Sequence, residues 1–143
     1  MKINQKYKYI FVDYFDTTCF RHIHSFQIYH QWVKCMLAKI PELEEIPLDE
    51  IVDLRHRAHH MVGEKYEEAP YCQTMEMLYE LLEKRVKLFL DRQSFVEASL
   101  NIDISVEIGC QYGNQEIIRM LRKEKAKGKK IFLVSDFYLP ASA

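Results

Sequence analysis

The chain has 143 residues, of which 48% are hydrophobic and 29% are charged, a composition typical of one soluble globular domain with its own core. Its 20 Lys and Arg and 21 Asp and Glu residues give a formal net charge of -1, so composition provides no attraction for nucleic acid or for an anionic membrane. The apolar runs are far shorter than the roughly 20 residues that cross a bilayer, and the N-terminus has no signal-peptide pattern. We therefore expect a cytoplasmic protein that binds neither nucleic acid nor membranes.

The first predicted element is a buried strand over residues 7–12, an aromatic and β-branched run that stops at Asp13. A helical period follows, with apolar residues at three- and four-residue steps from Tyr29 to Ile40. Pro41 comes next and ends this helix.

Two further helical stripes occupy the middle of the chain. One follows Pro47 and is expected to end at Gly63. The next is expected to begin with Thr74 as its N-cap and to reach Phe89. Residues 91–112 predict one or two more helices, around Phe95 and Val106.

A last helix and a second strand complete the pattern. Asn114 is a candidate N-cap for this helix, and Gly128 is placed where a left-handed residue ends a helix. The apolar run Ile131–Val134 then predicts a strand that is followed by Ser135 and Asp136. Two strands joined through helices are expected to pair in parallel, and ligands of such sheets bind beyond the carboxyl ends of the strands.

Other chemistry-bearing residues have simpler interpretations. The four cysteines, at 19, 35, 72 and 110, are far apart in the sequence and favour reduced thiols. His56 and His60 are one helical turn apart and could share a cation, but no third ligand is identifiable and we expect a solvated helix face. The following aromatic residues are expected in the core of the helical region: Trp32, Tyr66, Tyr71 and Tyr79.

Residues 11–18 read Phe-Val-Asp-Tyr-Phe-Asp-Thr-Thr, a hydrophobic strand followed by Asp13, with Thr17 four positions later. This segment resembles the first motif of the haloacid dehalogenase (HAD) superfamily. The wording Asp-x-Phe-Asp-Thr over residues 13–17, with Arg21 four positions further on, is similar to a bacterial HAD subgroup whose motif reads Asp-x-Phe-Asp-Thr-Leu-Leu-x-Arg.

Residues 134–139 read Val-Ser-Asp-Phe-Tyr-Leu and resemble the second motif of the same subgroup, usually Ile-Ser-Asp-Met-Tyr-Leu. The resemblance implies an α/β fold. A partial HAD-like, Rossmann-like core of parallel strands would comprise residues 1–20 and 113–143. A large helical insertion of the C1 cap type would comprise residues 21–112.

The resemblance also implies a catalytic centre at the first motif. Asp13 would be the nucleophile that forms an aspartyl-phosphate intermediate. Asp13 and the backbone carbonyl of Phe15 would be ligands of Mg²⁺. Thr17 would orient Asp13 or its loop, and Asp16 is the nearest further carboxylate.

The remaining site residues would bind the substrate. The Ser135 hydroxyl would donate a hydrogen bond to the transferring phosphoryl group, and Asp136 belongs to the same motif. Arg21 could pair with an anionic substrate or with an acidic residue of the cap, because its planar guanidinium suits both.

Two departures from the family pattern bear on activity. Phe15 stands where HAD phosphatases usually have a second Asp as general acid and base, a role worth about 10² to 10⁴ in rate. The sequence ends at Ala143, directly after the second motif, so the Lys of the third motif and the acidic pair of the fourth have no counterpart here. We therefore expect at most half of the family's site in this chain.

These observations predict a HAD-like, Mg²⁺-dependent hydrolase, a phosphatase for a small phosphorylated metabolite, truncated before the third and fourth motifs. The alternative is a non-catalytic, HAD-derived interaction module. In that case the uncovered surface of the sheet would be completed by a second copy, as a homo-oligomer, or by the missing C-terminal half.

Overall fold

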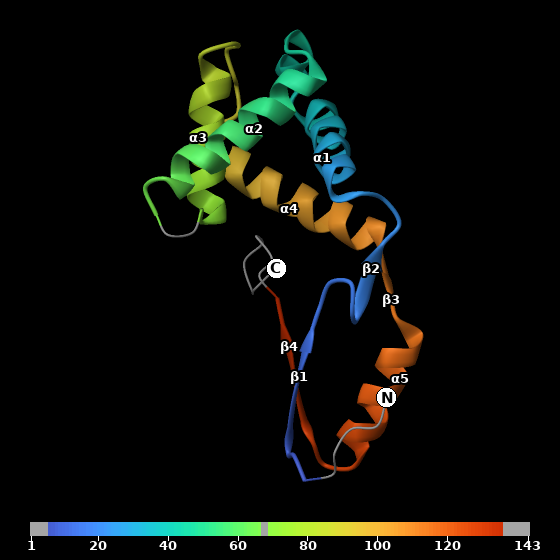
Figure 1. The fold of residues 1–143 in the computed structure, drawn as a ribbon. Helices are drawn as coiled ribbons and strands as arrows, with labels where there is room; N and C mark the ends of the chain where they lie inside the picture. Colours follow the sequence, from blue (N-terminus) through green and yellow to red (C-terminus); the bar gives the residue numbers. More distant parts are fainter. Residues whose placement is uncertain (1–5, 67–68, 136–143) are drawn as a thin grey trace. The chain divides into compact units, whose positions relative to one another are not determined.

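The computed structural model describes residues 6–66 and 69–135 and is a mixed α/β structure (Figure 1). The chain divides into two compact units. The described part of the strand-bearing unit is residues 6–22 and 111–135, and that of the helical unit is residues 23–66 and 69–110. The boundaries expected from the sequence, after residue 20 and before residue 113, each differ from these by two residues.

The strand-bearing unit contains a parallel pair, β1 (Tyr9–Asp13) and β4 (Lys130–Val134). The register runs from Tyr9 opposite Lys130 to Asp13 opposite Val134, which confirms the predicted parallel pairing. β1 begins at Tyr9 and not at residue 7, because its partner strand starts at Lys130, whose backbone N–H donates to the carbonyl of Lys8 at 2.9 Å.

A short antiparallel ribbon lies in the same unit and was not predicted. It consists of β2 (Cys19–Arg21) and β3 (Gln111–Gly113). Strands of three residues carry no readable hydrophobic alternation, so the sequence pattern could not indicate them. The ribbon joins two segments that are about ninety residues apart in the sequence.

Helix α5 (Gln115–Ala126) connects this ribbon to β4. The predicted N-cap is confirmed, because the Asn114 side chain accepts hydrogen bonds from the backbone N–H groups of Glu116 and Ile117. Gly128 has a φ of +85°, the left-handed conformation expected of it after the helix.

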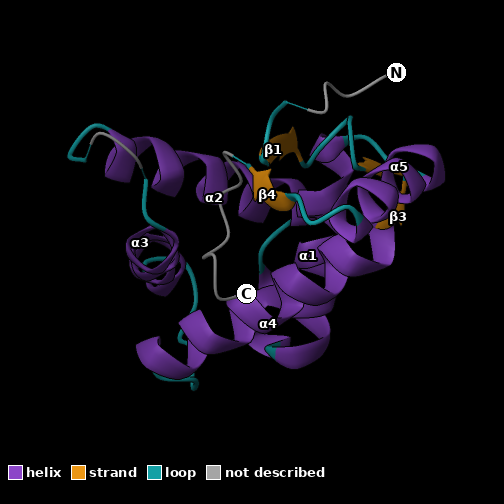
Figure 2. Cartoon of the chain, turned by 90° about the horizontal axis from the view of Figure 1, so that it is seen from below, coloured by secondary structure: helices purple, strands orange, loops and turns teal. Residues whose placement is uncertain are grey.

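The helical unit is built from four α-helices and one 3₁₀ helix among its described residues. Pro41 and Pro47 separate the first three elements, as the sequence predicts. In both Figure 1 and Figure 2, α1 lies alongside α4. The elements are α1 (Ser25–Lys39), η1 (Pro41–Glu45), α2 (Leu48–Gly63), α3 (Tyr71–Glu83) and α4 (Arg92–Cys110).

Three predictions for this unit were wrong in detail. Helix α3 begins at Tyr71, because Pro70 provides its start, and Thr74 lies one turn inside with its hydroxyl donating to the carbonyl of Pro70 at 3.0 Å. Phe89 lies beyond the end of α3 and is 78% exposed. Tyr66 is 40% exposed and outside the core.

The core of the helical unit is well filled. Trp32 and Phe95 are completely buried, and Tyr71 and Tyr79 lie in the same cluster, as predicted. Residues 92–110 form one continuous helix where one or two were expected. None of the described helices combines the length and apolar character needed to cross a membrane.

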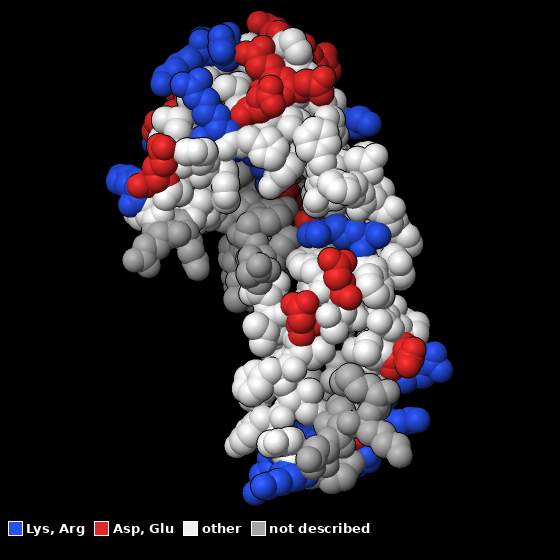
Figure 3. Space-filling view, viewed as in Figure 1, with Lys and Arg blue, Asp and Glu red and all other residues white. Residues whose placement is uncertain are grey.

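Charged residues of both signs share the surface of the helical unit. Figure 3 shows acidic side chains gathered near η1 and the start of α2, with basic side chains beside them. Arg85 and Glu50 form an ion pair of 3.2 Å on this surface. This face therefore presents no field of a single sign.

Candidate functional site

The parallel register brings the ends of the two predicted motifs to one edge of the sheet. Asp13 is the last residue of β1 and lies opposite Val134, the last residue of β4. The Tyr14 N–H donates to the carbonyl of Val134 at 3.0 Å, so the pairing continues past the strand end. Asp13 and Ser135 are both exposed there, and Asp136 lies outside the described residues.

A tight turn follows Asp13 and is closed by backbone hydrogen bonds. The N–H groups of Thr18 and Cys19 both donate to the carbonyl of Tyr14, at 3.0 and 2.8 Å. The Asp16 N–H donates to the carbonyl of Cys19 at 2.8 Å, and Asp16 has a φ of +54°. Asp tolerates this left-handed conformation better than most residues, so its presence at this position suits the turn.

Two threonine hydroxyls from this turn reach back to Asp13. Thr17 Oγ1 donates to the carboxylate oxygen Oδ2 at 3.3 Å. Thr18 Oγ1 donates to the backbone carbonyl of Asp13 at 2.7 Å, and Thr18 is 8% exposed. One hydroxyl therefore restrains the carboxylate and the other restrains the strand end.

Asn114 also donates hydrogen bonds to this turn. Its side-chain amide donates to the carbonyl of Thr17 at 3.0 Å, and its backbone N–H donates to the carbonyl of Thr18 at 2.9 Å. The same residue caps α5, so the position of the turn is coupled to the start of that helix. Sequence analysis identified the cap but not this second role.

Arg21 and Phe15 lie together. The Arg21 guanidinium carbon is 3.9 Å from the centre of the Phe15 ring, a cation–π arrangement. The ring of Tyr14 meets the ring of Phe15 edge-on, with centroids 4.9 Å apart. Arg21 thus places its guanidinium over an aromatic ring of the turn that follows Asp13.

A polar cluster that the sequence did not indicate supports the base of this turn. The Tyr14 hydroxyl and the Cys19 thiol both donate to the side-chain carbonyl of Gln111, at 2.9 and 3.2 Å. Gln111 is distant in the sequence and reaches this place only through the β2–β3 ribbon. The four cysteines are all free thiols, and Cys19 is the buried one.

The strand end offers hard oxygen ligands but no complete metal centre. Within residues 6–66 and 69–135, no group of three or more His, Cys, Asp and Glu side chains is arranged to hold an ion. The Asp13 carboxylate is exposed at the strand end, and oxygen ligands of this kind suit Mg²⁺, which keeps several waters in protein sites. Asp13 is therefore the carboxylate at this strand end through which a partly hydrated Mg²⁺ would be held.

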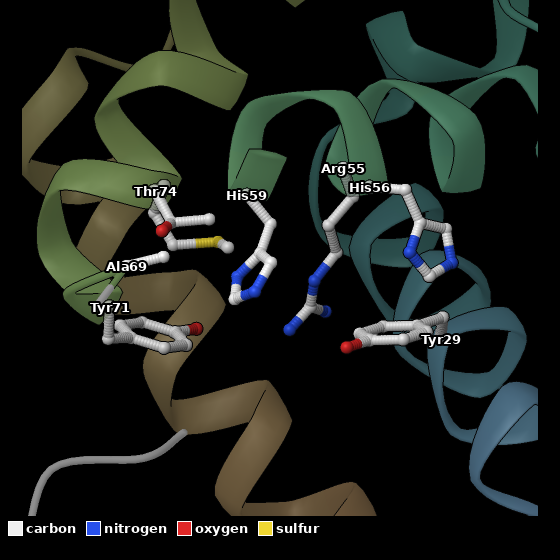
Figure 4. A pocket seen from close by; sticks show the side chains of 8 residues that line it. Tyr29, Arg55, His56, His59, Ala69, Tyr71 and Thr74 are labelled. Carbon is white, nitrogen blue, oxygen red and sulfur yellow. The ribbon is translucent and has the colours of Figure 1, made fainter. Parts of the chain in front are cut away.

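The pair of histidines on α2 fits a solvated helix face better than a shared cation. His56 and His60 are both exposed. The His60 ring faces Glu64 at 3.5 Å, whereas the His56 ring meets the Tyr29 ring edge-on with centroids 4.8 Å apart (Figure 4). Because the two rings have different neighbours, the structure gives no support for a shared cation.

A buried ion pair occupies the helical unit, and sequence analysis did not identify it. Arg55 on α2 is 3% exposed and Asp103 on α4 is 0% exposed. Their side chains form two hydrogen bonds, of 3.1 and 2.8 Å, and the Tyr71 hydroxyl donates to Asp103 at 2.6 Å. The sequence signal was Arg55 itself, a charged residue in the apolar stripe of α2.

No family model matches the chain, and no curated protein matches its sequence.

Proposed function

We propose that the chain is a HAD-type, Mg²⁺-dependent hydrolase that acts as a phosphatase on a small phosphorylated molecule through Asp13. The observation that carries this proposal is the parallel register that ends at Asp13 and Val134, because it brings residues from both predicted motifs to one sheet edge. Ligands of open α/β sheets bind at this edge. The Thr17 hydroxyl that restrains the Asp13 carboxylate lends further support.

The proposed reaction has two displacements at phosphorus. Asp13 Oδ attacks the phosphorus, the bond from phosphorus to the ester oxygen breaks, and the departing alcohol oxygen takes up a proton. Water then attacks the phosphorus of the aspartyl phosphate, which releases inorganic phosphate and restores Asp13. Bound Mg²⁺ would neutralise phosphate charge during both displacements, held by Asp13 and the Phe15 carbonyl.

The other strand-end residues have subordinate roles in this proposal. Thr17 holds the carboxylate in one orientation, so that an oxygen faces the phosphorus. The Ser135 hydroxyl donates to the phosphoryl oxygens. Arg21 provides a fixed cation for the anionic substrate, and Asp16 is the carboxylate nearest in sequence that could protonate the departing oxygen.

The test measures whether Asp13 accepts a phosphoryl group. The thermal unfolding midpoint of the whole chain is compared with and without Mg²⁺ plus beryllium fluoride, which mimics an aspartyl phosphate. A ligand that binds only the folded state raises this midpoint. We expect a rise in the wild type, none in Asp13→Asn, and an unchanged rise in Asp53→Asn, which removes one exposed carboxylate from α2.

Hydrolysis of p-nitrophenyl phosphate in Mg²⁺ provides the second measurement. Activity that disappears in Asp13→Asn and persists in Asp53→Asn supports the hydrolase. A beryllium fluoride response that is equal in the wild type and Asp13→Asn overturns the role of Asp13. The absence of any response favours the non-catalytic alternative.

That alternative is an interaction module that binds a second copy through the sheet, and a specific observation favours it. Tyr9, Phe11 and Phe132 share one face of the β1–β4 pair, where the rings of Phe11 and Phe132 stack with centroids 5.2 Å apart. Phe11 is nevertheless 69% exposed. Figure 3 shows mainly uncharged surface where these strands lie. Parallel sheets are normally covered on both faces, and the same face of a second copy would cover this one symmetrically.

The oligomeric state tests the interaction module. Light scattering over a range of concentrations would show a dimer that Phe11→Ser disrupts. Phe89→Ser is the matched control, because Phe89 is an aromatic residue of the helical unit that is 78% exposed, against 69% for Phe11. A monomer at all concentrations, or equal disruption by both variants, contradicts the interaction module.

A further inference from the structure

Positive charge is concentrated in the strand-bearing unit. Its described residues include ten Lys and Arg and four Asp and Glu, whereas those of the helical unit include nine and fourteen. The expectation that the chain binds no nucleic acid is based on the total charge of -1, which averages over this division. The attraction of each unit for charged partners therefore has to be judged separately.

The exposed cations gather at the end of the unit where both strands of the parallel pair begin. The Lys130 N–H donates to the carbonyl of Lys8 at 2.9 Å, so these two residues lie side by side at this edge. Helix α5 brings its last turn to the same edge, because only a short connection separates it from β4. Figure 3 shows basic side chains at this end of the unit. The exposed cations of this basic end are Lys8, Arg122, Lys123, Lys125 and Lys130.

The carboxylates of the unit leave the basic end positive. Glu124 is almost completely buried and pairs with Lys127 and Lys129. Glu116 lies in the first turn of α5, at the other end of that helix. The remaining two carboxylates of the described part belong to the strand end and the turn at the opposite edge of the sheet. Residues 1–5, outside the described part, contain one Lys and no Asp or Glu.

Two exposed aromatic rings flank Lys8. Tyr7 is 61% exposed and Tyr9 is 55% exposed. Exposed rings beside cations suit single-stranded nucleic acid, because an unpaired base stacks on a ring while a neighbouring phosphate meets a cation. We propose that the basic end binds single-stranded nucleic acid, independently of its sequence, through its five cations and the Tyr7 ring.

The outer face of α5 favours nucleic acid over an anionic membrane. Its exposed residues Arg119, Arg122 and Lys123 recur at three- and four-residue steps. All residues of α5 are described, and none of its large apolar side chains is exposed. A helix that lies on a membrane buries an apolar face in the acyl boundary, which this exposed face lacks. A row of cations instead matches the repeated charges of a phosphate backbone.

This proposal stands apart from the chemistry of Asp13. The five residues of β1 separate the basic end from Asp13 by roughly 13 Å, at about 3.3 Å per residue. Binding is measured in EDTA, without Mg²⁺, and Asp13→Asn is expected to bind normally. Failure of this proposal therefore leaves the phosphatase untouched, and failure of the phosphatase leaves this proposal untouched.

The salt dependence of binding provides the measurement. Fluorescence anisotropy of a labelled oligo(dT) of about 20 nucleotides follows binding by the whole chain from about 50 to about 200 mM NaCl. For single strands, each phosphate contact contributes about -0.7 to the slope of log K against log salt. Five cations therefore predict a slope of about -3.5, which is a loss of affinity of about a hundredfold over this range.

Variants separate the contribution of charge from that of stacking. Lys123→Gln combined with Lys125→Gln removes two of the five cations and is expected to reduce the slope to about -2. Tyr7→Ser is expected to weaken binding at least about fivefold and to leave the slope unchanged, because stacking releases no ions.

The helical unit supplies matched controls. Lys84→Gln combined with Lys87→Gln removes two exposed lysines there. Tyr66→Ser removes a tyrosine that is 40% exposed and lies next to Lys65, as Tyr7 lies next to Lys8. Both controls are expected to keep the affinity and slope of the wild type. Thermal unfolding of each variant shows that it is folded.

Three results would overturn the proposal. One is the absence of saturable binding to oligo(dT) at the lowest salt, or equal weakening by the controls in the helical unit. Another is duplex DNA that binds as tightly as oligo(dT) with no effect of Tyr7→Ser, which shows a general attraction for polyanions. The third is stronger binding to vesicles that contain phosphatidylserine than to oligo(dT), which identifies a membrane surface instead.

Discussion

The two units of the chain bury the same kinds of residue to very different extents. In the helical unit, Trp32 and Phe95 are 0% exposed. In the strand-bearing unit, Phe11 and Leu133 lie on paired strands and are still 69% and 58% exposed. Buried apolar area is the main favourable term in folding, so stability is concentrated in the helical unit. The strand-bearing unit instead exposes carboxylates and hydroxyls at its strand ends.

The largest expected effect comes from removing one phenylalanine ring from each unit. Phe95→Ala creates a cavity in a filled core and is expected to lower the free energy of unfolding by about 3–5 kcal/mol. Phe11→Ala removes a mostly exposed ring and is expected to change it by at most about 0.5 kcal/mol. Urea unfolding measures both values. An equally large loss for Phe11→Ala would show that a partner or a second copy covers this face in solution.

The second prediction compares a buried ion pair with an exposed one. Asp103→Asn leaves the Arg55 guanidinium buried without its countercharge, and we expect a loss of about 3 kcal/mol in the free energy of unfolding. Glu50→Gln makes the same chemical change in the exposed pair with Arg85, where we expect at most about 1 kcal/mol. Equal losses in urea unfolding would mean that Arg55 keeps a hydrated environment.

Elements with a local signal were predictable from the sequence. The helix that follows Pro47 ends at Gly63, and the Asn114 cap and the left-handed Gly128 lie where their chemistry requires them. The strand ends were also predictable, because an apolar run that stops at Asp13 or Ser135 marks the edge of a sheet. The parallel pairing followed from the intervening helices.

What escaped prediction depends on contacts between distant segments. Gln111 joins the turn near Asp13 only through a ribbon whose strands are too short to show a pattern. Asp103 reaches Arg55 from another helix, and nothing near Asp103 in the sequence indicates burial. Thr74 resembles a cap by residue type, but Pro70 begins the helix four residues earlier. Tertiary packing decided each of these cases.

The third prediction uses one glycine from each unit. A Cβ added at Gly128 or at Gly109 would meet no atom within 4 Å, so packing does not distinguish the two positions. Gly128→Ala forces a side chain into φ of +85° and is expected to lower the free energy of unfolding by about 1–2 kcal/mol. Gly109→Ala lies in the last turn of α4 and is expected to raise it by up to about 0.5 kcal/mol through helix propensity. Effects of the same sign would contradict the assigned backbone conformations.

The smallest expected effect is a dependence on pH confined to the strand-bearing unit. Hydrogen bonds from Lys127 and then Lys129 hold the pKa of Glu124 below its ordinary value. Lys129 Nζ lies 2.8 Å from Glu124 Oε2, and both side chains are almost completely buried. Because the folded state has the lower pKa, this stabilisation is present above the ordinary glutamate pKa of about 4.3 and is lost as the pH falls through the lowered value.

Glu124→Gln tests this assignment. The variant should reduce the unfolding midpoint near neutral pH, and the gap from the wild type should close as the pH falls below about 4.3, where the glutamate takes up its proton. Glu116→Gln, at the start of the same helix, provides the control. A difference in unfolding midpoint that stays constant across this pH range would contradict the assignment. It would mean that Glu124 stabilises the connection between α5 and β4 through its packing and not through its charge.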